Sequence, residues 1–112
     1  MVIWMLAIRI DVDGKITPVS FNRKYLNDQI WRELDGYYDI IRLDPQCAML
    51  VDDEGLLKGK PRNRTAEKIA GYLGQLVGTA LLIGIEMTDD GEDFCQVPRW
   101  ALDILLDKGV LS

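Results

Sequence analysis

The chain has 112 residues, of which 48% are hydrophobic and 28% are charged, and 13 Lys and Arg against 18 Asp and Glu give a formal net charge of −5. These values are typical of a single globular domain and exclude disordered, collagen-like and coiled-coil chains. The sequence contains no histidine. This excludes Ser-His-Asp and Cys-His triads, histidine bases and the usual mixed zinc sites.

The two cysteines and the apolar segments indicate the compartment. Cys47 and Cys95 are too few and too far apart for a CxxC metal or redox motif, and small secreted domains usually carry more cysteines. The apolar start of the chain lacks the basic region and cleavage site of a signal peptide, and the apolar stretch at 81–85 is far shorter than the ~20 residues that span a bilayer. We therefore expect a cytoplasmic domain without a membrane segment, with both cysteines as small buried hydrophobic residues.

Apolar periodicity and turn signals predict strands at 2–10, 15–21, 37–43, 47–51, 80–87 and 94–97, and helices at 22–34, from 63 onward and from 98 onward. The first strand is apolar at nearly every position, which indicates a central strand. Pro18 cannot donate to a strand ladder, so the second strand is expected at an edge. Gly36 is the expected stop of the first helix. Gly71 and Gly74 leave two alternatives for the second helix, an early end or a close approach to the sheet.

This order of elements predicts an α+β fold, with a mixed β-sheet and about three helices packed on it in a single domain, 1–112. The opening strand-strand-helix-strand suggests a β-grasp-like N-terminal half, and a ferredoxin-like split is the alternative. Trp4, Trp31 and Trp100 occupy expected core positions in their elements.

Most candidate sites have a simpler explanation. The Asp-Gly steps at 13–14 and 90–91 fail the EF-hand spacing and fit hairpin turns. The segment 55–61 lacks the spacing and the Ser or Thr of a Walker motif. Asp52, Asp53 and Glu54 offer an acid and a base in principle, but such clusters usually solvate a turn. We therefore expect no enzymatic activity, no cofactor and no metal.

One loop has an unusual charge for an acidic chain. Lys58, Lys60, Arg62 and Arg64 precede or begin the second predicted helix, whose expected N-cap is Asn63. Helix N-termini carry unpaired N–H groups and partial positive charge, so this segment is a candidate anion site formed by all five residues. The alternative is a solvated basic loop that offsets the acidic residues at 52–54.

The same region contains two short patterns, Asp-Glu-x-Gly-Leu and Pro-x-Asn-x-x-Ala, matched by Asp53, Glu54, Gly55, Leu56, Pro61, Asn63 and Ala66. On these residues the chain resembles a family of small uncharacterised proteins of bacteria, phages and plasmids, classified as a domain of unknown function. The resemblance implies a cytoplasmic accessory protein, often carried on a mobile element. It implies no activity and no catalytic residues.

Together these observations predict a non-enzymatic binding domain. Its expected partner is an anionic small molecule, such as a nucleotide or another phosphate-bearing ligand, held by the Lys58–Arg64 loop. The alternative is a protein-interaction module of a phage or mobile element that acts on a host factor through its acidic turns at 52–54 and 88–93. The net charge of −5 argues against nucleic acid. No membrane is implied.

Overall fold

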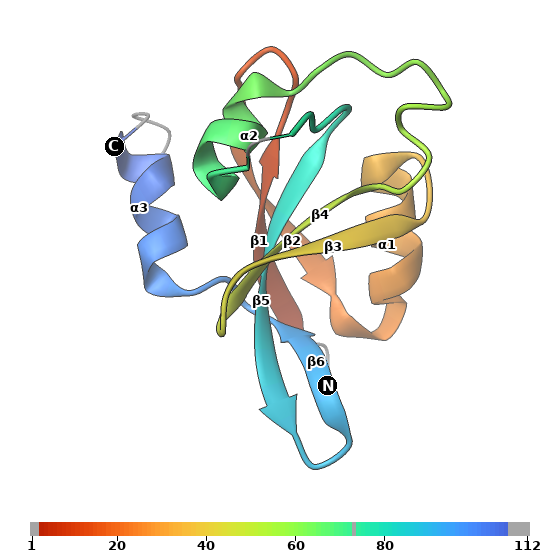
Figure 1. Ribbon diagram of the computed structural model, residues 1–112. Helices are drawn as coiled ribbons and strands as arrows, with labels where there is room; N and C mark the ends of the chain where they lie inside the picture. The colour runs from red at the N-terminus through yellow and green to blue at the C-terminus, as the bar shows by residue number, and fades with distance from the viewer. Residues whose placement is uncertain (1–2, 73, 108–112) are drawn as a thin grey trace.

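The computed structural model describes residues 3–72 and 74–107 (Figure 1). The strands are β1 (Trp4–Ile10), β2 (Ile16–Asn22), β3 (Tyr38–Asp44), β4 (Cys47–Asp52), β5 (Ala80–Thr88) and β6 (Gly91–Cys95). The helices are α1 (Leu26–Leu34), α2 (Arg64–Ala70) and α3 (Arg99–Asp107), with a short 3-10 helix η1 (Arg23–Tyr25) before α1. The predicted α+β class with three helices is confirmed. None of the helices in this part of the chain is long and apolar enough to cross a membrane.

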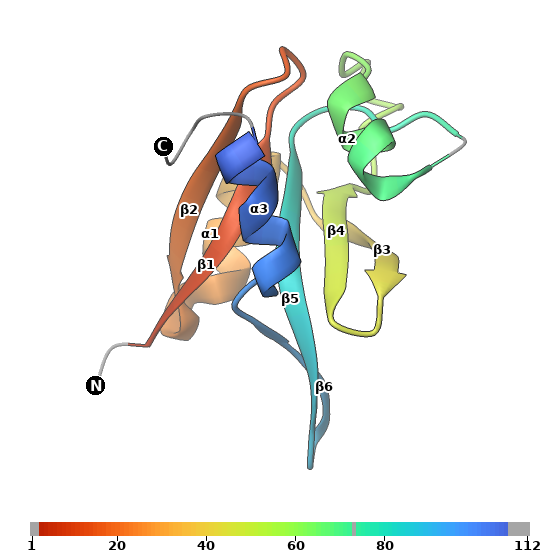
Figure 2. The same cartoon turned by 90° about the vertical axis from the view of Figure 1, so that its left-hand side faces the viewer.

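The strands form one sheet in the order β2-β1-β5-β4-β3, and β6 pairs with the far half of β5. All pairs between these six strands are antiparallel, so the expectation of a mixed sheet is wrong in that respect. For three of the five pairs the reason is local, because β1–β2, β3–β4 and β5–β6 are hairpins and short hairpins join antiparallel strands. The directions of the pairs β1–β5 and β4–β5 depend on the tertiary arrangement. Pro18 lies in the edge strand β2 opposite Ile8, and β1 lies inside the sheet, as predicted. Figure 2 shows the β5–β6 hairpin extending beyond the rest of the sheet.

Helices cover both faces of the sheet (Figures 1 and 2). Side chains of a strand alternate between faces, and β1 shows this clearly. Met5 and Ala7 pack in the cluster that contains Ile30 of α1, whereas Ile8 and Ile10 pack in the cluster that includes residues of α2 and α3. The two clusters are separate hydrophobic layers on either side of the sheet.

The first two long helices end in left-handed residues. Asp35, with φ of 57°, follows α1, and its backbone N–H bonds back to Trp31 O. The predicted stop at Gly36 is therefore one residue late. Gly36 has a different role, because a Cβ there would lie 2.5 Å from Oδ1 of Asp52. For the second helix, the early end is the alternative that holds, since α2 stops at Gly71 with φ of 63°.

Two further expectations are wrong. Trp4, Trp31 and Trp100 are 60%, 46% and 38% exposed. Trp4 and Trp100 stand at the beginning of β1 and α3, and the residues that α1 buries are Ile30 and Leu34 rather than Trp31. The predicted acidic turn at 88–93 is shorter, because Gly91 has φ of 108° and allows a tight turn at Asp89 and Asp90. Of the rest of the expected turn, Thr88 belongs to β5, and residues 91–93 belong to β6. The C-terminal end predicted for the last helix, at 108–109, lies outside the described residues.

Candidate functional site

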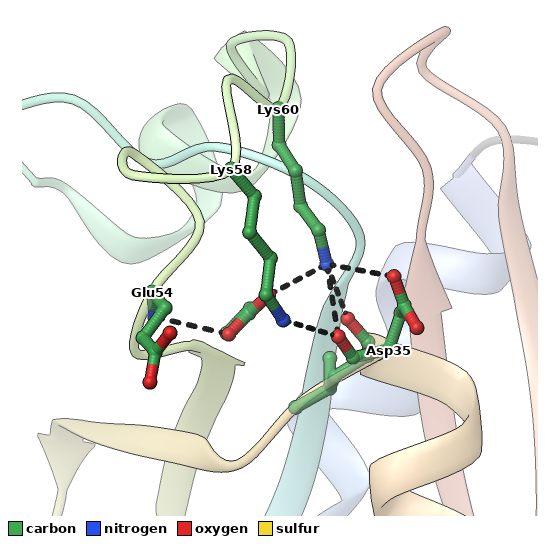
Figure 3. A network of polar contacts seen from close by, with 6 residues as sticks. Asp35, Glu54, Lys58 and Lys60 are labelled. Atoms are coloured by element: carbon green, nitrogen blue, oxygen red, sulfur yellow. Dashed lines mark hydrogen bonds and ion pairs between the residues drawn. The ribbon is translucent and has the colours of Figure 1, made fainter.

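The loop after β4 folds back onto the end of that strand. Lys58 Nζ donates to Asp52 Oδ2 at 2.8 Å and to the carbonyl oxygen of Asp35 at 2.6 Å. Lys60 Nζ lies 2.7 Å from the same Asp52 oxygen and donates to Leu34 O at 2.6 Å. Figure 3 shows both lysine side chains reaching toward Asp35 at the end of α1. The two ammonium groups thus join the loop to a buried carboxylate and to the unpaired carbonyls of a helix C-terminus.

Asp52 is the centre of this network. Its side chain is 1% exposed and also accepts a hydrogen bond from the backbone N–H of Glu54 at 3.0 Å. Burial alone raises the pKa of this carboxyl, but hydrogen bonds from Lys58, Lys60 and Glu54 outweigh it and lower the pKa to about 2. The carboxylate is therefore ionised at neutral pH. The hydrogen bond between Lys58 and Asp52 also raises the pKa of Lys58.

Arg62 is also held by an acid of this chain. Its guanidinium donates to Glu67 from Nε at 2.9 Å and from a terminal nitrogen at 2.9 Å, a bidentate pair. Glu67 accepts a further hydrogen bond from the backbone N–H of Leu76 at 2.9 Å. These hydrogen bonds, led by that from Arg62, lower the pKa of Glu67. The ion pair joins α2 to the loop before it, and the hydrogen bond from Leu76 joins α2 to the segment that follows it.

Asn63 is fully buried, and both the oxygen and the nitrogen of its side-chain amide form hydrogen bonds. Oδ1 accepts from the N–H of Ala66 at 3.0 Å, which confirms the predicted helix cap. Nδ2 donates to Ile10 O at 2.9 Å and to Gly78 O at 2.8 Å. Asn63 therefore joins α2, β1 and the approach to β5.

The five candidate residues of the loop thus have different surroundings. Lys58 and Lys60 come together on Asp52, Arg62 lies on Glu67, and Asn63 is interior. Arg64, the first residue of α2, is exposed and forms no ion pair within the part of the chain that the structure describes.

Asp52 also corrects an expectation. The acidic cluster at 52–54 does not simply solvate a turn, because Asp52 is 5% exposed, whereas Asp53 and Glu54 are on the surface. The signal that could have separated them is position: Asp52 directly continues the apolar run of β4, whose six residues are all buried. A carboxylate in such a place needs a partner, and nearby lysines are the natural ones.

The two cysteines differ. Cys47 in β4 is fully buried, and burial raises the pKa of its thiol to about 12, as expected of an inert core thiol. Cys95 in β6 is only partly buried, so the expectation that both would be core residues is wrong for it. β6 pairs with the far half of β5, which extends beyond the layers that cover Cys47.

A second candidate site lies on the α1 face of the sheet. A trough of about 710 Å³ has η1 and the start of α1 as one wall and residues of β3, β5 and β6 as its floor, including Ile40, Ile85 and Phe94. Next to it lies a smaller hollow, here called the aromatic pocket, of about 460 Å³. The aromatic pocket is lined by Asn27, Asp28, Trp31, Tyr37 and Tyr38. The two hollows share Asn27, Asp28 and Tyr38.

Ion pairs close the trough toward β6. Arg23 of η1 pairs with Asp93 and donates to Phe94 O at 2.9 Å. Arg42 of β3 donates to Glu92 at 2.7 Å. The cations of the trough are thus largely committed to β6, whereas the lining of the aromatic pocket contains no cation.

Sequence reasoning missed the aromatic pocket. Trp31 and Tyr37 are 46% and 74% exposed, and the ring of Tyr38 meets Phe94 edge-on with centroids 5.6 Å apart. The signal available in the sequence was the spacing of Trp31 and the Tyr37-Tyr38 pair on either side of a helix stop. Exposed aromatic side chains grouped in a hollow are typical of a recognition surface.

Comparison with known proteins gives a family but no relative of known function. No curated protein and no solved structure matches the chain. The model of one family, described as Domain of unknown function (DUF3846), matches residues 5–108. The match covers both candidate sites and every strand of the sheet except the first residue of β1. The chain therefore belongs to the DUF3846 family.

Proposed function

We propose that this domain acts by binding another protein, with the aromatic pocket and the adjoining trough as its contact surface. The observation that carries the proposal is the grouping of Trp31, Tyr37 and Tyr38 in one hollow, with Trp31 about half exposed and Tyr37 largely exposed. Trp and Tyr supply much of the binding energy at protein interfaces, since they bury large apolar surfaces and keep a polar group for hydrogen bonding. This role is one of binding and requires no catalytic group.

The neighbouring sheet edge supports the same role. Tyr37 O accepts from Asp53 N, and Asp39 is the partner of Val51, so alternate residues of β3 bond to β4. The residues between them turn their backbone groups to the open edge, where Ile40 N–H donates to the side chain of Asp39 at 3.0 Å. An extended segment of a partner can add to such an edge while its side chains enter a neighbouring pocket.

The two acidic turns predicted from the sequence differ in how far their carboxylates are available to a partner. Asp52 is committed to two lysines, whereas Asp89 and Asp90 are exposed at the tip of the β5–β6 hairpin. In the setting of a phage or mobile element, the partner would be a protein of the host. The hairpin tip would then add acidic contacts outside the aromatic pocket.

A site-specific cross-link tests the proposal. With a photo-cross-linking amino acid in place of Tyr37, we expect capture of one defined protein in cells that produce the domain. The same amino acid in place of Tyr72, which is 44% exposed and does not line either hollow, is the matched control. With the purified partner, Trp31→Ala should weaken binding by about tenfold or more, as is usual for a central aromatic residue, and Tyr72→Ala should not. Equal capture from both positions, or an unchanged affinity of Trp31→Ala, would contradict the proposal.

Recognition of a phosphate-bearing ligand by the Lys58–Arg64 loop stays a prediction from the sequence. A phosphate there must compete with Asp52 for the two lysines and with Glu67 for Arg62. The exposed Arg64 is the residue most available to it.

An amide titration distinguishes the two functions. With phosphate or a nucleotide at ~0.15 M salt, where screening acts over ~8 Å, we expect only weak shifts spread over the surface. A saturable response confined to residues 63–66, lost in Arg64→Glu and kept in Lys68→Glu, would establish anion binding instead. Lys68 is the control because it is an exposed cation of the same helix.

A further inference from the structure

Building on the proposed function, we infer that the aromatic pocket receives a cationic side chain of the partner, arginine or lysine. Trp31 lies on α1, Tyr37 directly before β3 and Tyr38 at its start. The faces of Trp and Tyr rings carry negative electrostatic potential and attract ammonium and guanidinium groups. Three such rings around one hollow suit a cation better than a purely apolar group.

The polar groups of the aromatic pocket point to the same ligand. Asp28 is the only acidic or basic residue in its lining, and it forms no ion pair within the described residues. Asn27 adds an amide oxygen that can accept a hydrogen bond. An apolar occupant would cover this carboxylate without a partner, which is unfavourable, and an anion would be repelled. A basic side chain satisfies both the carboxylate and the rings.

The surface beside the pocket already contains a contact of this kind. Lys24 Nζ lies 5.5 Å from the centroid of the Tyr25 ring, on the wall of the adjoining trough. The aromatic pocket has the rings and the acid but no cation of its own. The net charge of −5 also favours approach of a basic partner over an acidic one.

Short peptides test the inference on the free domain. The probes are acetyl-Gly-Arg-Gly-amide, its lysine counterpart and the citrulline peptide, which keeps the shape of arginine without its charge. We expect the indole N–H signal of Trp31 to shift and saturate with the first two at millimolar concentration, and the citrulline peptide to bind at least fivefold more weakly. Asp28→Asn should weaken arginine binding at least threefold, whereas Asp103→Asn, which changes an exposed acid of α3 outside the lining of both hollows, should leave it unchanged. Amide spectra of both variants check that the fold is kept.

The outcomes separate this inference from the proposed function. Equal binding of the arginine and citrulline peptides, or unchanged arginine binding by Asp28→Asn, would overturn the cationic ligand. The protein-binding proposal would still stand if Tyr37 cross-links to a partner in a Trp31-dependent way. Tetramethylammonium is the probe for a free small cation. If it binds more tightly than either peptide, the pocket serves a small molecule, and the inference of a partner side chain is overturned.

Discussion

Replacement of Asp52 by Ala should lower the free energy of unfolding by about 3–5 kcal/mol, because it removes the buried carboxylate that pairs with the mostly buried Lys60 and accepts the backbone N–H of Glu54. Most of this loss of stability comes from Lys60, whose side chain is 17% exposed, because Lys58 can turn to solvent. Urea unfolding at neutral pH measures the change. The matched control is Asp53→Ala, which alters the exposed neighbour and should change the free energy of unfolding by less than about 0.5 kcal/mol.

The same carboxylate predicts a pH dependence of stability. The pKa of Asp52 is about 2 in the folded protein, below its ordinary value of 3.8. A lowered pKa in the folded state means that the unfolded chain binds the proton more readily, so this stabilisation is complete above about pH 4 and is lost as the pH falls through 2. The difference of nearly two pKa units corresponds to about 2 kcal/mol. The urea midpoints of wild type and Asp52→Asn should therefore approach each other as the pH falls from 5 to 2. A constant difference between the two midpoints would show that the charge of Asp52 does not contribute to stability.

The change Asn63→Ala should also lower the free energy of unfolding, by at least about 3 kcal/mol. A lost helix cap accounts for about 1 kcal/mol, and each buried carbonyl left without a donor costs about 1–3 kcal/mol. The carbonyls affected are those of Ile10 and Gly78. Urea midpoints measure the effect, with Asn27→Ala on the exposed surface of α1 as the control.

A second variant at this position separates the two contributions. Asn63→Asp keeps the oxygen that caps α2 but places a carboxylate against two carbonyl oxygens. We expect it to be at least as unstable as Asn63→Ala. Recovery of most of the wild-type stability by Asn63→Asp would mean that capping, rather than the bonds to the strands, is what Asn63 contributes.

The secondary structure was largely predictable from the sequence, because it depends on local patterns. The apolar run of β1 and the proline of β2 indicate an interior and an edge strand, and both are confirmed. Asn63 was predictable as a cap because Asn at a helix start accepts a nearby N–H whatever surrounds it. Its two donor bonds were not, since they reach residues 53 and 15 positions away along the chain.

The candidate sites depended on tertiary structure. Asp52, Asp53 and Glu54 look alike as a sequence, and only the packing of β4 against the end of α1 buries the first and brings Lys58 and Lys60 to it. Helical periodicity placed Trp31 near the core-facing residues of α1, but the position of α1 over the sheet decides how much of the indole stays exposed.

The aromatic pocket also depends partly on local sequence and partly on tertiary structure. The sequence by itself determined that a helix bearing Trp31 ends shortly before a strand that begins near Tyr37 and Tyr38. That the three rings line one hollow was decided by the left-handed turn at Asp35 and by the place of β3 at the edge of the sheet. Local patterns determine which element forms, because they act over a few residues. Which side chains meet depends on the free energy of packing the whole chain.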